Sequence, residues 1–280
     1  MSRTPAVGLR TRAARASADD PLRSVSIALS ILDCFGVATE LGPSAVAREL
    51  GIAKSTASRM LAVLASRGVL ERHGPGRYRL GLRMFEFGQL ALSRLNLFEA
   101  SVPVLAALRD RVRDLVQLGV PMGGEVLFLD RFESQNLDPR FHGQQWRRVP
   151  AHSSSSGRAI AAFNPTVARS MFEAGLIRRT RYTVVDPHRL GEILAEIRRR
   201  GYAATHEELE EGISSVAAPI LIGDGEDLRA IAAVSVAGPS TRLQRGGIAT
   251  IAAHTREAAD HIGRQLRTAP PPLSTREPHL

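Results

Sequence analysis

Cysteine, lysine and long apolar runs are nearly absent from this sequence, and the first and last of these shortages each exclude a class of protein. The single cysteine, Cys34, excludes an internal disulfide and any zinc site built from several cysteines. Because Cys34 lies in an apolar helical pattern, we interpret it as a buried structural thiol. No apolar run approaches the roughly 18 residues of a membrane span, so we expect a soluble, cytoplasmic protein without a membrane partner.

Catalytic and cofactor motifs are also missing. The sequence holds no G-x-S-x-G nucleophile turn, no metal-ligand cluster at a recognisable spacing and no phosphate-binding glycine loop, so we expect no metal, no cofactor and no enzymatic activity. His152 precedes four serines, but adjacency in sequence does not place a base against its nucleophile. One acidic run could bind a cation, although we prefer a solvated acidic turn: Glu207, Glu208, Glu210 and Glu211.

The net charge of +9 is concentrated in the first third of the chain. Residues 1–95 contain 14 basic and 7 acidic residues, whereas the remainder contains 23 and 21. Nearly all of the basic residues are arginine, and Lys54 is the only lysine. A basic footprint is what contact with phosphates requires, so a nucleic-acid partner is expected for the N-terminal part.

The stretch 44–68 has the pattern of two short helices joined by a tight turn. Val46, Ala47 and Leu50 give one apolar helical face, and Gly51 can adopt a positive φ at the turn. A second apolar face follows at Ala57, Met60, Leu61 and Leu64. The pattern predicts a helix-turn-helix, although an ordinary helical hairpin with a solvated polar face would share it.

The polar face of the second helix and the segment after it favour DNA binding. Hydroxyls and cations gather near the N-terminus of that helix, where free N–H groups suit phosphates and base edges: Lys54, Ser55, Thr56, Ser58 and Arg59. Two short strand patterns around 73–76 then predict a hairpin, which makes the unit a winged helix. The wing would carry three arginines to the DNA, unless the hairpin merely covers the core: Arg72, Arg77 and Arg79.

These segments resemble the IclR-type bacterial transcriptional regulators. The matching stretches span about 24–266 and include 26–32, 45–61, 76–81, 152–159, 200–203, 216–220 and 235–239. The resemblance implies an α+β protein in which a winged helix-turn-helix is joined by a linker helix to a GAF-like effector-binding domain. It also implies assembly as a homodimer or homotetramer.

We expect five regions along the chain. They are a disordered basic arm (1–20), the winged helix-turn-helix (21–81), a linker and dimerisation helix (82–96), the effector-binding domain (97–267) and a disordered tail (268–280). The linker helix is apolar on two sides, one with Met84, Phe87, Ala91 and Leu95 and the other with Leu82, Phe85 and Leu92. We infer that it packs against a second subunit, so that two recognition helices bind a palindromic operator, unless both sides pack within one chain.

Short strand patterns and flanking helices predict an antiparallel α+β second domain. Strands are expected at 116–120, 126–131, 202–205, 214–222 and 228–237, with a hairpin at 223–225. Helices are expected at 97–115, from a cap at Asp186 to Gly201, and at 245–266. In the first domain, Ser24 is expected to cap an amphipathic helix that closes the core.

The resemblance also assigns a ligand pocket to the second domain. The family holds small organic acids at positions matching 153–157, Thr205, Ser215, Ser235 and Ala237, which gives the candidates Ser154, Ser155, Ser156, Thr205, Ser215 and Ser235. Thr205 replaces the usual Asp, and four serines replace a more apolar loop, so this pocket is expected to be more polar and less acidic. The serines could instead form only a turn and an N-cap. Five residues are expected near the cavity: Phe141, His142, Trp146, Arg147 and Arg148.

Together these features predict a ligand-responsive DNA-binding transcriptional regulator. A small organic acid would shift the arrangement of subunits and so control binding to double-stranded operator DNA. Two alternatives stay open: a nucleic-acid binder without sequence preference whose ligand domain is vestigial, and a small-molecule enzyme with a DNA-binding appendage.

Overall fold

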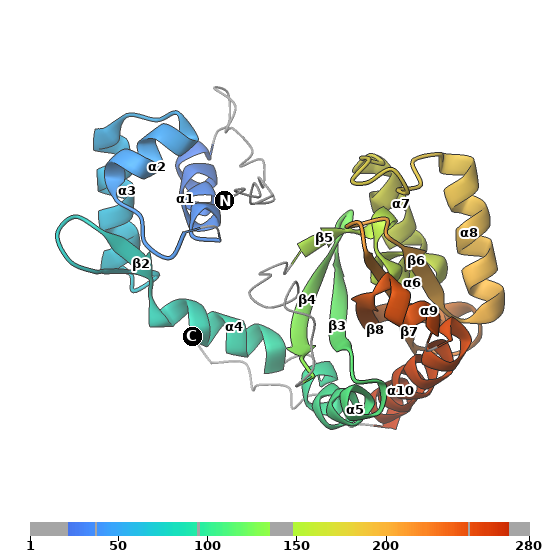
Figure 1. Cartoon of the computed structure of the whole chain (residues 1–280). Coiled ribbons are helices and arrows are strands. Elements are labelled where there is room, and N and C mark those ends of the chain that lie inside the picture. The colour runs from blue at the N-terminus through green and yellow to red at the C-terminus, as the bar shows by residue number, and fades with distance from the viewer. Residues whose placement is uncertain (1–21, 37, 94–95, 135–147, 246, 269–280) are drawn as a thin grey trace. The chain divides into compact units, whose positions relative to one another are not determined.

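A computed structural model of the protein describes residues 22–36, 38–93, 96–134, 148–245 and 247–268. The chain divides into two compact units, one ending at Arg94 and the other beginning at Leu95 (Figure 1). The expected basic arm and the expected tail beyond Thr268 lie outside the described residues. Within the described residues, no helix combines the length and the apolar character needed to cross a bilayer.

The first unit is a winged helix-turn-helix followed by one more helix. Its elements are α1 (Arg23–Cys34), α2 (Pro43–Leu50), α3 (Lys54–Ser66), β1 (Leu70–Arg72), β2 (Tyr78–Leu80) and α4 (Leu82–Ser93). The three helices and the hairpin enclose one apolar core formed by Ile27, Ile31, Phe35, Val46, Ala57, Leu61, Leu70 and Tyr78. The predicted helix-turn-helix and its wing are therefore confirmed.

Local signals explain most of the boundaries in this unit. Pro43 begins α2, where its missing N–H would have no helical partner in any case. Gly51 ends α2 with φ of 66°, a left-handed conformation that favours glycine. The predicted cap at Ser24 is wrong, because α1 already begins at Arg23 and Leu22 occupies the N-cap position. Cys34 is only partly buried, and its Sγ donates to the Ser30 carbonyl at 3.3 Å.

The second unit contains one sheet and six α-helices within its described residues. The strands are β3 (Leu115–Met122), β4 (Glu125–Phe132), β5 (Arg148–Pro150), β6 (Ala203–His206), β7 (Ile213–Ile222) and β8 (Arg229–Pro239). The helices are α5 (Leu97–Val112), α6 (Ser155–Phe163), α7 (Pro165–Glu173), α8 (Pro187–Arg200), α9 (Ser240–Arg245) and α10 (Ile248–Thr268). Two 3-10 turns, η2 (Ala151–Ser153) and η3 (Gly225–Asp227), complete it.

The sheet is antiparallel, with the strand order β5-β4-β3-β8-β7-β6. Side chains alternate between its faces, so the sheet contributes to two cores. One core packs against α5 and α10, and the other packs against α6, α7 and α8 (Figure 1). The expected α+β class with an antiparallel sheet and flanking helices is confirmed.

Three details of the second unit differ from the expectation. The expected closing helix at 245–266 begins three residues later, at Ile248 in α10, because Gly247 adopts φ of 75° just before it. The expected helix at 97–115 ends at Val112, where Arg113 turns the chain with φ of 56° into β3. The short elements β5 and α7 have no counterpart in the sequence-based prediction.

Candidate functional site

The N-terminal edge of α3 presents the polar residues that the sequence assigned to DNA. Lys54, Ser55, Ser58 and Arg59 are exposed, and Thr56 is half-buried, whereas the opposite face buries Ala57 and Leu61 in the core. The N-cap position is Ala53, whose side chain cannot accept a hydrogen bond from the first turn. Among the described residues, no ion pair involves Lys54 or Arg59. The edge therefore offers cations, hydroxyls and uncapped N–H groups to an anionic partner.

The arginines of the wing are exposed but already have partners. Arg77 bonds the Glu40 carboxylate and carbonyl, both at 3.1 Å, and Arg79 bonds Glu71. Arg72 lies over the Tyr78 ring at 5.7 Å. Exposed ion pairs of this kind contribute only about 0–1 kcal/mol, so a phosphate can displace the carboxylates. The wing differs from α3 in that it must exchange partners to bind DNA.

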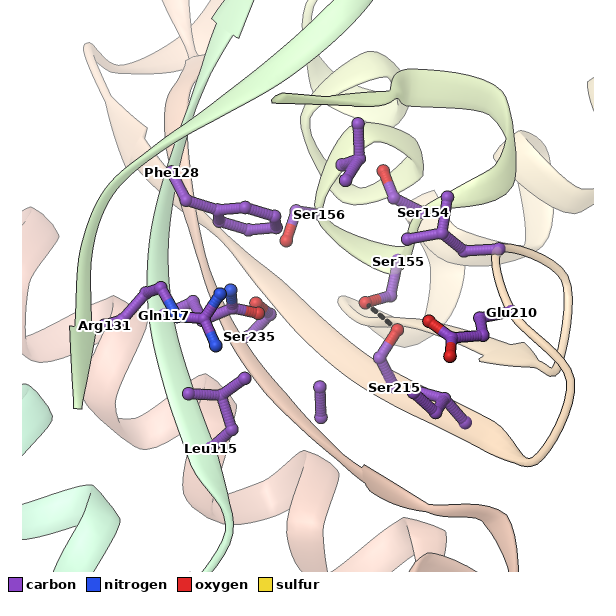
Figure 2. Close-up of a pocket in the computed structure, with 14 residues that line it drawn as sticks. Leu115, Gln117, Phe128, Arg131, Ser154, Ser155, Ser156, Glu210, Ser215 and Ser235 are labelled. Atoms are coloured by element: carbon purple, nitrogen blue, oxygen red, sulfur yellow. Dashed lines mark hydrogen bonds between the residues drawn. The ribbon is translucent and has the colours of Figure 1, made fainter. Parts of the chain in front are cut away.

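A small cavity lies between the sheet and the start of α6 in the second unit (Figure 2). Its volume is about 60 Å³, well below the roughly 300–1,000 Å³ of pockets for drug-sized ligands, so it suits a ligand of a few heavy atoms. The lining residues are Leu115, Gln117, Phe128, Arg131, Val149, Ser154, Ser155, Ser156, Leu209, Glu210, Ile213, Ser215, Ser235 and Ala237. Five of the six predicted effector residues are thus brought together.

The serines at the start of α6 have distinct structural roles. Ser154 is the N-cap, and its Oγ accepts a hydrogen bond from the Gly157 N–H at 3.1 Å. Gly157 lies so close to η2 that an added Cβ would be 2.3 Å from the Ala151 backbone. Ser155 Oγ pairs with Ser215 Oγ at 2.8 Å. The alternative of an N-cap is therefore correct for Ser154, while Ser155 links the helix to β7 in the cavity wall.

Thr205 lies behind the cavity wall rather than among the lining residues. It pairs with Ser215 in the register of β6 and β7, and its Oγ1 is 2.8 Å from Ser215 Oγ. Ser215 is thus held between two hydroxyls, Ser155 on one side and Thr205 on the other. A substitution at Thr205 would affect a ligand in the cavity indirectly, by changing the position of the Ser215 hydroxyl.

A row of polar side chains crosses three strands on the floor of the cavity. The sheet register pairs Arg131 of β4 with Gln117 of β3, and Gln117 with Ser235 of β8. Ser235 is 2% exposed, and its Oγ has no hydrogen-bond partner among the described residues. Burying a hydroxyl without a partner costs about 1–3 kcal/mol, so a ligand that bonds this oxygen would recover that cost.

The sequence-based prediction missed the two charged residues of the cavity, Arg131 and Glu210. A β-bulge between Leu118 and Gly119 of β3 and their partners on β4 puts Arg131, instead of Asp130, opposite Gln117. Strict alternation from Phe128, which lines the cavity, would have pointed Asp130 inward. Glu210 lies in the loop between β6 and β7, and no sequence pattern places a loop residue of this kind in a cavity.

Of the five residues expected near the cavity, the structure describes only Arg148. Phe141, His142, Trp146 and Arg147 lie outside the described residues. Arg148 belongs to β5 and pairs with Leu127 in the register, and it is not among the lining residues.

His152 has a structural hydrogen bond of its own. Its Nε2 is 3.0 Å from the Ile177 carbonyl, an arrangement in which the ring N–H donates. Burial lowers the pKa of His152 from its ordinary value of 6.5, against a smaller opposite effect of the bond to Ile177. Among the described residues, His152 makes no hydrogen bond to a serine hydroxyl, so the Ser–His arrangement of nucleophilic catalysis is not formed.

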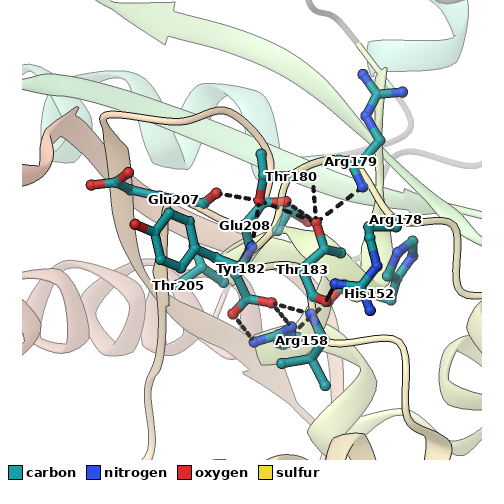
Figure 3. Close-up of polar contacts among 12 residues, drawn as sticks. His152, Arg158, Arg178, Arg179, Thr180, Tyr182, Thr183, Thr205, Glu207 and Glu208 are labelled. Carbon is teal, nitrogen blue, oxygen red and sulfur yellow. Dashed lines mark hydrogen bonds and ion pairs between the residues drawn. The ribbon is translucent and has the colours of Figure 1, made fainter.

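A buried ion pair anchors the loop that carries Glu210 (Figure 3). Arg158 of α6 is 1% exposed, and its Nη1 and Nη2 donate to the two Glu208 oxygens at 2.7 and 2.5 Å. Arg158 Nε donates to the His152 carbonyl at 2.6 Å, and Glu208 also accepts from the Val184 N–H at 3.0 Å. The expected solvated acidic turn is therefore wrong for Glu208, whose carboxylate is buried and bidentate with arginine.

Comparison with known proteins agrees with this pairing of a winged helix-turn-helix and a pocket-bearing α+β unit. Residues 24–74 match the family described as the IclR helix-turn-helix domain, and residues 89–264 match the bacterial transcriptional regulator IclR C-terminal domain. The chain is 34% identical over 258 residues to the HTH-type transcriptional regulator BhcR of Paracoccus denitrificans, covering 90% of this chain and 91% of that one.

Two crystal structures have the same fold. An IclR homolog from Microbacterium hydrocarbonoxydans, complexed with 4-hydroxybenzoate, is 30% identical with a TM-score of 0.76, covering 88% of this chain and 100% of that one. The IclR protein of Thermotoga maritima is 28% identical with a TM-score of 0.67, covering 87% and 98%. The fold and its surfaces define a DNA-binding transcriptional regulator with an effector-binding domain. The chain belongs to the IclR family, which is a family of regulators rather than enzymes.

Proposed function

We propose that this regulator binds a palindromic operator as a homodimer or homotetramer in the cytoplasm, and that a small organic acid in the second unit controls that binding. The buried Ser235 hydroxyl carries the effector part of the proposal, because it lines the cavity and has no hydrogen-bond partner in the described part of the chain. The acid acts only through different affinities for the two subunit arrangements. The 4-hydroxybenzoate complex of the Microbacterium homolog supports an acid as the ligand class.

Both sets of predicted residues have roles in this proposal. The DNA-contacting residues are Lys54, Ser55, Thr56, Ser58 and Arg59 on α3 and Arg72, Arg77 and Arg79 on the wing. The effector is bound by Ser154, Ser155, Ser156, Ser215 and Ser235, with Thr205 orienting Ser215. The α3 residues enter the major groove, and the wing arginines contact phosphates.

The proposal is tested by operator selection followed by acid titration. Purified protein selects sequences from random DNA, and an inverted repeat with a fixed spacing is the expected product. Operator affinity is then measured at one salt concentration with a panel of short acids and 4-hydroxybenzoate, because affinity for DNA depends steeply on salt. At least one acid is expected to change operator affinity about 5- to 150-fold. Acids that bind tightly and leave operator affinity unchanged would refute the coupling.

The exposed apolar side chains of α4 support the dimer. Leu82 is 79% exposed and Phe85 is 64% exposed, although both are large and apolar. Phe87, 48% exposed, lies against the Arg83 guanidinium at 5.3 Å. A second copy of the same helix would remove these side chains from water, and two-fold symmetry would pair two recognition helices. The side chains of Ala91, Leu92 and Leu95 lie outside the described ones.

Phe85→Glu is expected to dissociate this dimer. A carboxylate buried in an apolar interface has no partner, so we expect subunit affinity to fall by about 2 kcal/mol or more. Sedimentation at several concentrations measures the change, and operator affinity falls with it. Met122→Glu is the control, because Met122 is 41% exposed on the other unit and its replacement should leave the assembly intact. An unchanged sedimentation profile for Phe85→Glu would place the interface elsewhere.

A further inference from the structure

The effector cavity carries opposite charges on opposite walls. Figure 2 shows the Arg131 guanidinium entering from the sheet side and the Glu210 carboxylate entering from the loop side. Both residues line the same cavity of about 60 Å³. Arg131 already pairs with the exposed Glu133 at 3.6 Å, a weak contact that a ligand carboxylate can displace. A plain monocarboxylate bound at Arg131 would leave its apolar end against the Glu210 carboxylate. The pair of walls therefore suits a ligand with two different polar ends.

We propose that the effector is a short carboxylic acid that also carries a hydrogen-bond donor, with Arg131 binding the carboxylate and Glu210 accepting from the donor. The inference rests on the proposed function, because it assigns chemistry to the same cavity. The donor is a hydroxyl or an ammonium group, since a carboxylate accepts from either. The small volume limits the ligand to a few heavy atoms.

The sheet supplies the residues that bind the ligand's carboxylate. Arg131, Gln117 and Ser235 stand in one cross-strand row. The guanidinium is thus followed by a buried amide and by a hydroxyl for which the described residues offer no partner. The N-terminus of α6 is a weaker competitor for the carboxylate. Ser154 Oγ already accepts the Gly157 N–H at 3.1 Å, and Ser155 Oγ is engaged with Ser215. Arginine binds carboxylates through charge-assisted hydrogen bonds, which are the stronger interaction.

The loop supplies Glu210, the acceptor for the ligand's donor, and other contacts of the same loop fix its position. Glu210 lies two residues after Glu208, which is locked to Arg158. The same loop is held by Thr180, whose Oγ1 donates to the Glu207 carbonyl at 2.7 Å, and by Thr183, which donates to the Glu208 carbonyl at 2.7 Å (Figure 3). Glu210 is therefore presented on an anchored turn, as a residue that sets ligand specificity needs to be.

A series of three-carbon acids tests the assignment on the full chain. Propionate has no second polar group, pyruvate adds only an acceptor, lactate adds a hydroxyl donor, and alanine adds an ammonium donor. Calorimetry with both enantiomers of the last two is expected to show that at least one donor-bearing acid binds about tenfold or more tightly than propionate and pyruvate. Comparison of the affinities for lactate and alanine then shows whether the preferred donor is a hydroxyl or an ammonium group.

Two variants assign the ends of the ligand. Arg131→Met is expected to weaken every acid by about tenfold or more, and Arg131→Lys to recover part of the loss. Glu210→Gln is expected to remove the preference for the donor while carboxylate binding remains. The matched controls are Arg229→Met and Glu226→Gln, at exposed positions away from the cavity. Operator affinity without acid and the unfolding transition of each variant show that the fold is intact.

The outcomes separate this inference from the function on which it rests. Propionate binding as tightly as lactate and alanine, or a preference that survives Glu210→Gln, overturns the donor assignment while acid control of the operator stands. If Arg131→Met leaves acid binding unchanged, the ligand's carboxylate is bound at α6 instead, and the proposed orientation of the ligand is overturned. If no three-carbon acid binds but 4-hydroxybenzoate changes operator affinity, the inference fails and the proposed function survives. If no acid of the wider panel acts, both fail.

Discussion

Arg158→Met is expected to lower the free energy of unfolding of the second unit by about 3–5 kcal/mol. The substitution removes both hydrogen bonds to Glu208 and the bond to the His152 carbonyl. Of the contacts formed by described residues, the buried Glu208 carboxylate then keeps only the one to the Val184 N–H. An uncompensated buried charge is more costly than the lost pair is stabilising. Urea unfolding of the full chain, followed by circular dichroism, measures the shift of the second unit's transition.

Removing the second charge distinguishes this mechanism from simple loss of packing. In Arg158→Met with Glu208→Gln, no charge remains buried, and the glutamine oxygen can still accept from Val184. We expect the double variant to recover at least half of the loss. Arg189→Met is the matched control, because the Arg189–Glu192 pair at 2.8 Å is exposed on both sides and should contribute under about 1 kcal/mol. A double variant no more stable than Arg158→Met would contradict the buried-charge explanation.

The same pair links stability to ligand binding. Because Glu208 anchors the loop of Glu210, Arg158→Met is expected to weaken acid binding even at temperatures where the unit stays folded. This effect acts through the position of Glu210, so Arg158 is a positioning residue that does not itself line the cavity.

The winged helix-turn-helix was predictable because its determinants are local. Helical periodicity, the turn at Gly51 and a hairpin flanked by strand patterns act within a few residues of one another, and the core of the unit contains the residues with that periodicity. The predicted strands of the second domain succeeded for the same reason. Boundaries set by single backbone conformations, such as Gly247 between α9 and α10, were not recoverable from periodicity.

The charged part of the cavity was not predictable, because it depends on pairing between distant segments. A one-residue bulge decides whether Asp130 or Arg131 faces the cavity, and this choice inverts the charge of the wall. The Arg158–Glu208 pair joins residues 50 positions apart. From the sequence alone, the acidic run that contains Glu208 was therefore interpreted as a solvated turn. The serines were found because the family resemblance aligned them.

Arg59→Ala is expected to give the largest loss of operator binding among single substitutions on the DNA-binding surface. Arg59 is exposed on α3, one helical turn after Ser55, and no ion pair holds it among the described residues. Loss of a base contact costs about 1–3 kcal/mol, and a dimer on a palindrome loses it twice, or about 2–6 kcal/mol in all. Titration of the selected operator at fixed salt measures the loss.

Comparison with a wing variant separates base reading from phosphate contact. Arg77 must leave Glu40 to reach a phosphate, so Arg77→Ala is expected to cost under about 1 kcal/mol per half-site, equally for operator and random DNA. Arg67→Ala is the control on the same element, because Arg67 is the exposed C-cap residue at the opposite end of α3.

The sequence dependence of the Arg59 effect decides between the two kinds of DNA binder. A base-reading arginine relaxes the preference at one position of each half-site, whereas a phosphate contact weakens all sequences alike and lowers the salt slope by about one. If Arg59→Ala weakens operator and random DNA equally, the protein binds nucleic acid without sequence preference. If Arg59→Ala lowers operator affinity no more than Arg67→Ala does, α3 does not enter the groove by its N-terminal edge. In the proposed geometry, removing an exposed cation from the centre of that edge must lower operator affinity.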